Sequence, residues 1–297
     1  MSVPAAYLGV ILIWSTTPLG IQWSAQGATF SFAVMARMLI GLAICLLLLR
    51  ATRTAFPFTA AARQLYAISG LSMFAAMLLT YWGALHIPSG LISVIFGLSP
   101  LVTGVFAALW LSEHTLTPIR LTGLALALGG LWLIFGQPWP GDSRATLGTA
   151  AVLAGMTMQA LGLVWIKRLN VRISSLAITT GSLGVATPLF LLAWVVADAA
   201  RLPPDMTPRA LAAIVYLGVF GSVAGFTLYY YVIKHLDAGR VALITLVTPV
   251  AALLLGQTLN AEFIPARGWA GIALIGAGLL MYEWRALRAL RPALPGR

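Results

Sequence analysis

The sequence predicts an all-α membrane protein of ten transmembrane helices, arranged as two inverted five-helix repeats. Three observations predict this class. Hydrophobic residues make up 60% of the 297 residues, charged residues only 8%, and the mean hydropathy is +0.95, a combination that soluble domains do not show. The apolar residues form successive segments close to the roughly 20 residues that span a bilayer as a helix. Two long stretches also match each other at a constant offset of 149 residues.

The ten apolar segments are separated by short linkers that carry charged residues, Gly or Pro. Backbone groups in lipid must be hydrogen-bonded within the structure, so segments of this length are expected to be helices; barrel strands would be half as long and would alternate. The predicted spans are Ala5 to Ser24, Phe30 to Leu49, Leu65 to Leu85, Leu91 to Leu111, Leu121 to Phe135, Leu147 to Ile166, Leu176 to Val196, Ala210 to Ile233, Val241 to Leu259 and Gly268 to Trp284.

The first two spans are expected to be structural helices. No Lys or Arg precedes the first, as it would in a signal peptide, and its Leu19-Gly20-x-x-Trp23 is echoed by Leu161-Gly162-x-x-Trp165 in the sixth span. The single cysteine, Cys45, lies in the second span, so an intramolecular disulfide is excluded and apolar packing is its expected role.

The third and fourth spans match the eighth and ninth. Apolar residues match often by chance, but the shared Pro, His and Glu are rare in this chain, so duplication is favoured over chance similarity. The matched pairs are Tyr81/Tyr230, His86/His235, Gly90/Gly239, Ile95/Ile244, Pro100/Pro249 and Glu113/Glu262. Five spans per repeat is an odd number, so the second repeat starts on the opposite side of the membrane and is inverted. The predicted repeats are residues 1–138 and 139–297.

The basic residues predict the orientation. If Met1 is cytoplasmic, thirteen of the eighteen Lys and Arg residues lie in inner loops and the tail, four lie in outer loops, and Arg37 lies within a span. The positive-inside rule then places both termini in the cytoplasm. The same asymmetry accounts for the formal charge of +11. Because the basic residues are scattered over membrane-proximal loops, no nucleic-acid partner is expected.

Several residues occupy positions typical of one membrane family: Trp14 in the first span, Ala36-Arg37 in the second, and the repeated segment ending in Pro100…Glu113 and Pro249…Glu262. With these marks nearly the whole chain resembles the drug/metabolite transporter superfamily, in its ten-helix form built from two EamA domains. Within it the chain looks most like exporters of amino acids, including aromatic ones, of the bacterial inner membrane. One departure is visible. The second repeat has Thr179-Thr180-Gly181-Ser182 where an Ala-Arg pair is expected, so the function of Arg37 is not duplicated.

The paired prolines indicate where helices bend. Pro100 and Pro249 lie near the middle of their spans, where a proline removes an N–H group, frees a carbonyl one turn earlier and kinks the helix. Hinges beside a central site are predicted there. Flanking hydroxyls are candidates for substrate contact, or else for local backbone bonding and packing. They are Ser93, Ser99, Thr103, Thr245 and Thr248.

Apart from Glu283, at the very end of the tenth predicted span, Arg37 is the only charged residue inside a span. Its expected roles are a contact with a substrate carboxylate, or snorkelling or helix capping near its helix end. Gln159 is a further candidate, since an unpaired amide in hydrocarbon is costly unless another helix satisfies it. The interior aromatic residues either stack on the substrate or pack in the core; they are Trp14, Tyr81, Trp82, Tyr230 and Tyr231. Aromatic residues at span ends, such as Trp139 and Trp284, suit the membrane interface.

The predicted function is alternating-access export of amino acids or similar small metabolites. Export of purines or cationic drugs is the alternative within the class, and a channel or an intramembrane enzyme lies outside it. No metal motif, phosphate loop or intramembrane Asp pair is present, so no catalytic residue, metal or cofactor is expected. A small molecule and membrane lipid are the expected partners, and the oligomeric state stays open. Facilitated transport is expected, because all seven acidic residues lie at span ends or in loops.

Overall fold

In the computed structural model of the chain, the structure describes residues 2–110, 117–135, 144–169, 171–235, 238–282 and 284. These residues form helices and connecting loops, without a strand among them. The first repeat contains α1 (Val3–Ala25), α2 (Phe30–Ala51), α3 (Ala60–Gly83), α4 (Ser89–Gly97), α5 (Ser99–Trp110) and α6 (Pro118–Phe135). The second contains α7 (Ala145–Leu169), α8 (Ser175–Asp198), α9 (Pro208–Tyr216), the π-helix η1 (Leu217–Ala224), α10 (Gly225–His235), α11 (Ala238–Asn260) and α12 (Ala266–Tyr282).

These helices make ten membrane spans, because α4 and α5 form one span and α9, η1 and α10 form another. Seven spans are long and apolar enough to cross a membrane by length and composition, and three are shorter apolar helices. The predicted fold class is therefore confirmed. The largest boundary difference is at α3, which begins at Ala60 where Leu65 is predicted.

Hydroxyl side chains begin several of the helices. Thr29, Thr59, Ser174 and Thr207 each hold an extended backbone conformation, and each side chain accepts a hydrogen bond from the N–H three residues later. Such N-caps satisfy one of the four N–H groups that the start of a helix leaves free. The sequence therefore marks these boundaries with short polar residues placed just before the apolar runs.

The two matched prolines differ in their local structure. The fourth span is interrupted at Leu98, between α4 and α5, and Pro100 lies in the first turn of α5. By contrast α11 continues through Pro249. Pro100 has no N–H to extend the ladder of α4, which accounts for a break at this place. The same residue type at the same repeat position is thus accommodated in two ways.

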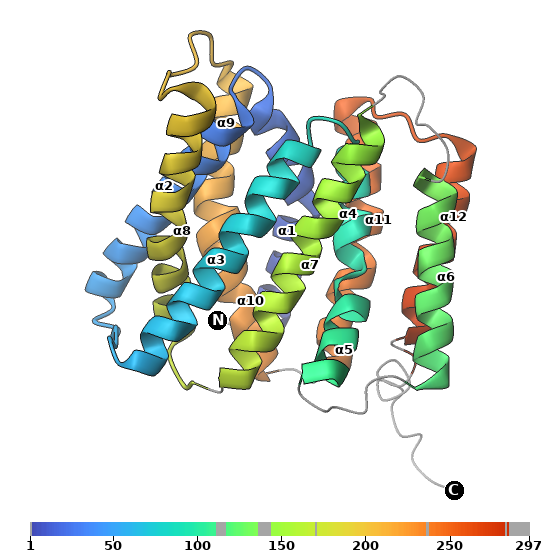
Figure 1. Ribbon diagram of the computed structural model, residues 1–297, viewed down its shortest axis with the longest axis horizontal. Helices are drawn as coiled ribbons and strands as arrows, with labels where there is room; N and C mark the ends of the chain where they lie inside the picture. The colour runs from blue at the N-terminus through green and yellow to red at the C-terminus, as the bar shows by residue number, and fades with distance from the viewer. Residues whose placement is uncertain are drawn as a thin grey trace, which may run out of the picture.

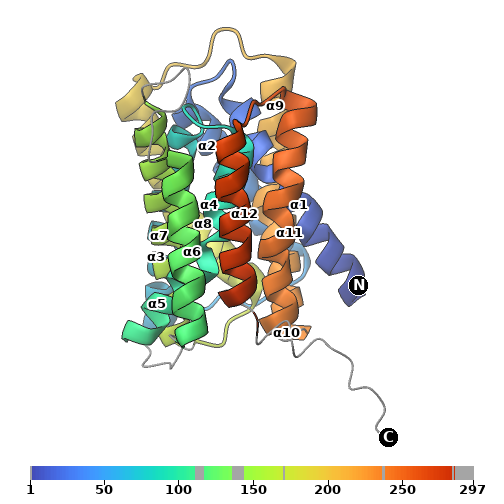
Figure 2. The same ribbon diagram turned by 90° about the vertical axis from the view of Figure 1, so that its right-hand side faces the viewer.

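The packing of the helices follows the inverted repeat. The close pairs α3–α7 and α1–α10 are equivalent contacts, because each packs the third span of one repeat against the first span of the other. The pairs α2–α8, α4–α11 and α6–α12 each join a span to its own counterpart. We group α3, α4–α5 and α7 as bundle 1, and α1, α9–η1–α10 and α11 as bundle 2. Figure 1 shows the helices side by side along one common direction, with α6 and α12 together at one edge. Figure 2 shows this edge from the front, with α12 between α6 and α11.

Glycines bring paired helices into backbone contact. A Cβ at Gly83 of α3 would lie 2.6 Å from the carbonyl oxygen of Gly148 in α7. Between α6 and α12, a Cβ at Gly123 would lie 2.5 Å from the carbonyl oxygen of Gly278. Any larger residue at these positions would separate the helices, as is usual where small residues mediate packing in a membrane.

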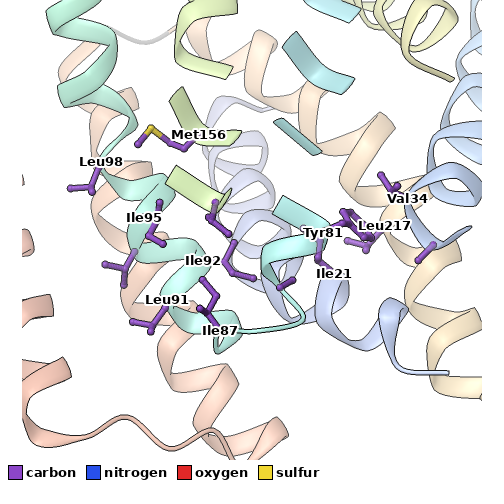
Figure 3. Packing of buried hydrophobic residues seen from close by; sticks show 14 of the residues in the cluster. Ile21, Val34, Tyr81, Ile87, Leu91, Ile92, Ile95, Leu98, Met156 and Leu217 are labelled. Atoms are coloured by element: carbon purple, nitrogen blue, oxygen red, sulfur yellow. The ribbon is translucent and has the colours of Figure 1, made fainter. Parts of the chain in front are cut away.

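The core surrounds α4. We call the end of the molecule where α1 begins the near end, and the opposite end the far end. In α4, which forms the far half of its span, every residue except Phe96 is buried, whereas α5 buries only Leu101, Gly104 and Ala107. Figure 3 shows Leu91, Ile92 and Ile95 of α4 in the large buried cluster. A separate small cluster, Ala6, Val10, Val232 and Ile244, joins α1, α10 and α11 toward the near end. The far half of the fourth span is therefore enclosed more completely than its near half.

Candidate substrate site

Arg37 lies inside the protein, where α2 meets α3 and η1. Its side chain is only 3% exposed. The Nε group donates a hydrogen bond to Ser222 Oγ at 3.0 Å, and Nη1 donates a longer one to Tyr81 Oη at 3.4 Å. Tyr81 itself is fully buried. The guanidinium therefore points into the helix bundle instead of reaching the surface by snorkelling.

The π-helix η1 makes room for this guanidinium. A Cβ at Gly221 would lie 3.0 Å from Arg37 Nη2, and a Cβ at Gly218 would lie 2.7 Å from Ile40 Cγ2 on α2. The absence of side chains at these two positions lets α2 approach η1 closely enough for the bond to Ser222. Short π-helical segments inside α-helices occur often at functional sites. Here the segment forms the surface that receives the buried charge.

The charge of Arg37 has no acidic counterpart in the described part of the protein. Its hydrogen-bond partners are two hydroxyl groups, and it forms no ion pair with any described residue. A guanidinium carries five N–H donors in a fixed planar arrangement that fits a carboxylate. A buried cation with neutral partners costs free energy unless an anion compensates it. The arrangement is suited to a carboxylate, given a rearrangement that exposes the guanidinium.

The aromatic candidates do not form one group. Trp14 on α1 packs against Tyr229 of α10, with ring centroids 4.6 Å apart. Trp82 lies next to Tyr81 in sequence but faces elsewhere: it packs on His86, with centroids 4.9 Å apart, and lines an apolar cleft of about 330 Å³ between α2, α3 and α8. The structure thus brings Tyr81 to Arg37 and leads Trp82 away from it.

The remaining polar candidates are spread along the helices. Gln159 on α7 and Ser99 at the start of α5 are half-buried, and Thr248, next to Pro249 in α11, is buried. Among the described residues, no hydrogen bond joins these three side chains to Arg37 or to one another. The side chains of Tyr230 and Thr245, and the whole of Glu113 and Trp139, lie outside the described residues. Their predicted roles stay predictions.

The structure adds residues that the sequence reasoning missed. Ser222, Gly218 and Gly221 complete the surroundings of Arg37, yet none was among the predicted site residues. A signal existed in the sequence, because Gly218, Gly221, Ser222 and Gly225 recur at the spacing of one helix face. Among the described residues no group of three His, Cys, Asp or Glu side chains is placed to hold a metal ion.

Comparison with known proteins places the chain among transporters. The sequence model of the EamA-like transporter family matches residues 3–136 and 146–283. The chain is 31% identical over 229 residues to a probable terminal-alkyne amino-acid exporter of Streptantibioticus cattleyicolor, covering 76% of this chain and 74% of that protein. It is 24% identical to the uncharacterized inner membrane transporter YedA of Escherichia coli, covering 64% of this chain and 60% of YedA.

A solved crystal structure has a similar fold. It aligns with a TM-score of 0.67 at 19% sequence identity, over 97% of this chain and 99% of the other. At this identity the likeness concerns the arrangement of the helices alone.

Proposed function

Because the chain belongs to the EamA-like transporter family, we propose that it exports amino acids, including aromatic ones, or similar small metabolites, by alternating access. Two bundles of helices related by an inverted repeat can exchange conformations and so open a central site to one side and then to the other. The observation that carries the choice of substrate is the buried Arg37, whose described partners are neutral hydroxyls. A substrate carboxylate would supply the missing anion through a bidentate contact.

The relatives support the same class of substrate. One of them is described as a probable amino-acid exporter. The Trp14–Tyr229 pair on the neighbouring helices α1 and α10 would offer an apolar surface to a side chain. In this proposal Arg37 selects the carboxylate, and the aromatic pair with Trp82, Gln159 and Tyr230 shapes the rest of the path.

The prolines would supply the bending that alternating access needs. At Pro100 the span is already divided into α4 and α5, so each part can tilt separately. Pro249 occupies the equivalent place in α11, within a helix that is continuous in this conformation. Carbonyl groups freed near either proline can accept a hydrogen bond from a substrate ammonium.

We propose that transport is facilitated, without coupling to protons. We also propose that the protein lies in a bacterial inner membrane, with its near end in the cytoplasm. In the described part of the chain the acidic side chains lie at helix ends and in loops; Asp198, for example, is the last residue of α8. A proton-coupled carrier needs a titratable group within the membrane whose protonation depends on substrate occupancy. The inner-membrane description of YedA and the placement of the basic residues support the location.

The test is a competition panel on the purified protein in liposomes. Uptake of one labelled amino acid is measured against all other amino acids, nucleosides and quaternary amines, with counterflow to distinguish a carrier from a channel. We expect saturable uptake, counterflow, and competition by amino acids. Competition by nucleosides or quaternary amines alone would refute the proposed substrate class. Non-saturable flux would indicate a channel, and chemical turnover without translocation an enzyme.

A further inference from the structure

The far end of the molecule contains a carboxylate bound to the start of a helix from the other repeat. Glu262, in the linker between α11 and α12, accepts hydrogen bonds from the backbone N–H of Ser89 at 3.1 Å and of Gly90 at 3.2 Å, one on each carboxylate oxygen. These are the first two residues of α4. The N–H groups of a first helical turn have no partner within the helix and favour an anion. We call this contact the Glu262 bridge.

Asn260 of α11 holds the carboxylate in place, and side chains from α1 and α9 support it. Asn260 donates through Nδ2 to Glu262 Oε1 at 3.0 Å and to Gln22 Oε1 at 2.8 Å, and it accepts from Trp23 Nε1 at 3.0 Å. The guanidinium of Arg209 lies 3.9 Å from the centroid of the Trp23 ring. Glu262 is thereby connected to the ends of α1, α9 and α11.

The bridge therefore crosses between the two bundles. Ser89 and Gly90 belong to bundle 1, and the supporting residues Gln22, Trp23, Arg209 and Asn260 all belong to bundle 2. The two bundles also approach each other here through Gly90, where a Cβ would lie 2.7 Å from Leu253 Cδ2 of α11. Opening the far end between α4 and α11 requires this polar contact to break.

We propose that the Glu262 bridge holds the far end closed and sets how often that end opens. This proposal rests on the proposed alternating-access function and names the residue that controls one of its two gates. The bridge is chemically suited to repeated opening, because water can replace charge-assisted hydrogen bonds at both the carboxylate and the helix start. The glycine contacts between α3 and α7 have no such replacement, since separating packed apolar surfaces forfeits their dispersion contacts.

Two substitutions break the bridge by independent routes. Glu262→Gln removes the charge and turns one acceptor oxygen into a donor, which cannot accept from an N–H. Gly256→Ala keeps the charge but adds a methyl group that overlaps Glu262 Oε2 and lies 2.9 Å from Glu262 Cδ. The matched controls are Asp205→Asn, an exposed carboxylate in the α8–α9 loop, and Gly276→Ala, where a Cβ has open space.

The readout is the thiol accessibility of a buried position behind the bridge. Ser93, one turn along α4 from Gly90, is 5% exposed. Ser93→Cys is introduced into a Cys45→Ala background, which removes the single native cysteine. Labelling by a membrane-impermeant maleimide is timed in intact cells and in inside-out vesicles. Each variant is first checked for a monodisperse profile in detergent.

We expect Glu262→Gln and Gly256→Ala each to raise the labelling rate from the far side about tenfold, as the loss of a charge-assisted helix cap predicts, while both controls label like the parent. An unchanged rate in the bridge variants, or an equal rise in the controls, would overturn the proposal. If Glu262→Gln fails to fold, Gly256→Ala decides the question. Labelling needs no substrate, so a failure of amino-acid transport leaves this result interpretable and counts only against the proposed function.

Discussion

Arg37 and Ser222, 185 residues apart in sequence, are joined by a hydrogen bond of 3.0 Å from Nε to Oγ. The bond ties the second span of the first repeat to the π-helix of the second repeat. It holds the guanidinium in the interior of the protein, where Arg37 is only 3% exposed. This relationship is the basis of the first two predictions.

The first prediction concerns selection of the carboxylate. Arg37→Lys keeps the charge but loses the planar pair of donors, and Arg37→Gln loses both. We expect amino-acid competition to weaken about tenfold or more in both variants, and Arg37→Gln to lose the preference for an amino acid over its amide. Competition by matched amino acids and amides in proteoliposomes measures this. A preference that survives in Arg37→Gln would show that Arg37 has a structural role only.

The second prediction concerns the fit of the π-helix against α2. In Gly221→Ala the new methyl group would lie 3.0 Å from Arg37 Nη2 and 3.4 Å from Leu217 Cδ2, so the guanidinium must shift. We expect the unfolding midpoint in detergent to fall by a few degrees, as for a modestly overpacked core, and transport to fall with it. Gly184→Ala on α8 is the control, because a Cβ there meets nothing within 4 Å. Equal midpoints for the two variants would contradict the close fit.

The third prediction concerns the hinges. Pro100→Ala restores an N–H that can extend the helical ladder across Leu98, so α4 and α5 should join into a stiffer helix. We expect slower transport in Pro100→Ala and Pro249→Ala, with normal membrane insertion, and the larger effect at Pro100, where the span is already divided. Pro118→Ala serves as the control, since Pro118 is the first residue of α6, where a proline is tolerated. Unaltered initial rates in both hinge variants would reject the role.

The fourth prediction concerns energy coupling. The sequence places no Asp, Glu or His in the middle of a predicted span, so a pH gradient is expected to lack a site through which to drive accumulation. We expect substrate flux in proteoliposomes to run down its own gradient and to be unchanged by an imposed pH gradient at zero membrane potential. Uphill accumulation driven by that gradient would contradict the prediction and direct attention to Glu113, His86 and Glu262, which are predicted to lie at span ends.

The sequence was sufficient to predict the spans, which depend on local composition, and the repeat, which is visible as residues that match at an offset of 149. An apolar run of some 20 residues has few alternatives to a helix in lipid, and Thr or Ser just before such a run marks where it begins. A bend was predicted at both prolines; the fourth span divides at Leu98, beside Pro100, whereas α11 runs as one helix through Pro249.

The site was harder to predict, because it depends on contacts between distant segments. Arg37 was recognised from its charge alone, but Ser222 gains its role only when glycines at 218 and 221 let α2 approach η1. Tyr81 and Trp82 are neighbouring interior aromatic residues, and the sequence does not distinguish them. In the structure Tyr81 accepts a hydrogen bond from Arg37, whereas Trp82 lines a cleft beside α8. Glu262 was visible as a repeat-matched residue, but its binding to the start of α4 follows from tertiary structure.

Arg37 has no counterpart in the second repeat, where Thr179-Thr180-Gly181-Ser182 occupies the corresponding stretch of α8. In a transporter built from two identical inverted repeats, the two opposite-facing conformations would have equal free energy. Here one half carries a buried cation and the other carries hydroxyls, so under the proposed mechanism the two orientations of the empty protein are expected to differ in free energy. Under the proposed function, a substrate carboxylate that neutralises Arg37 would change that balance, so substrate binding would itself favour reorientation.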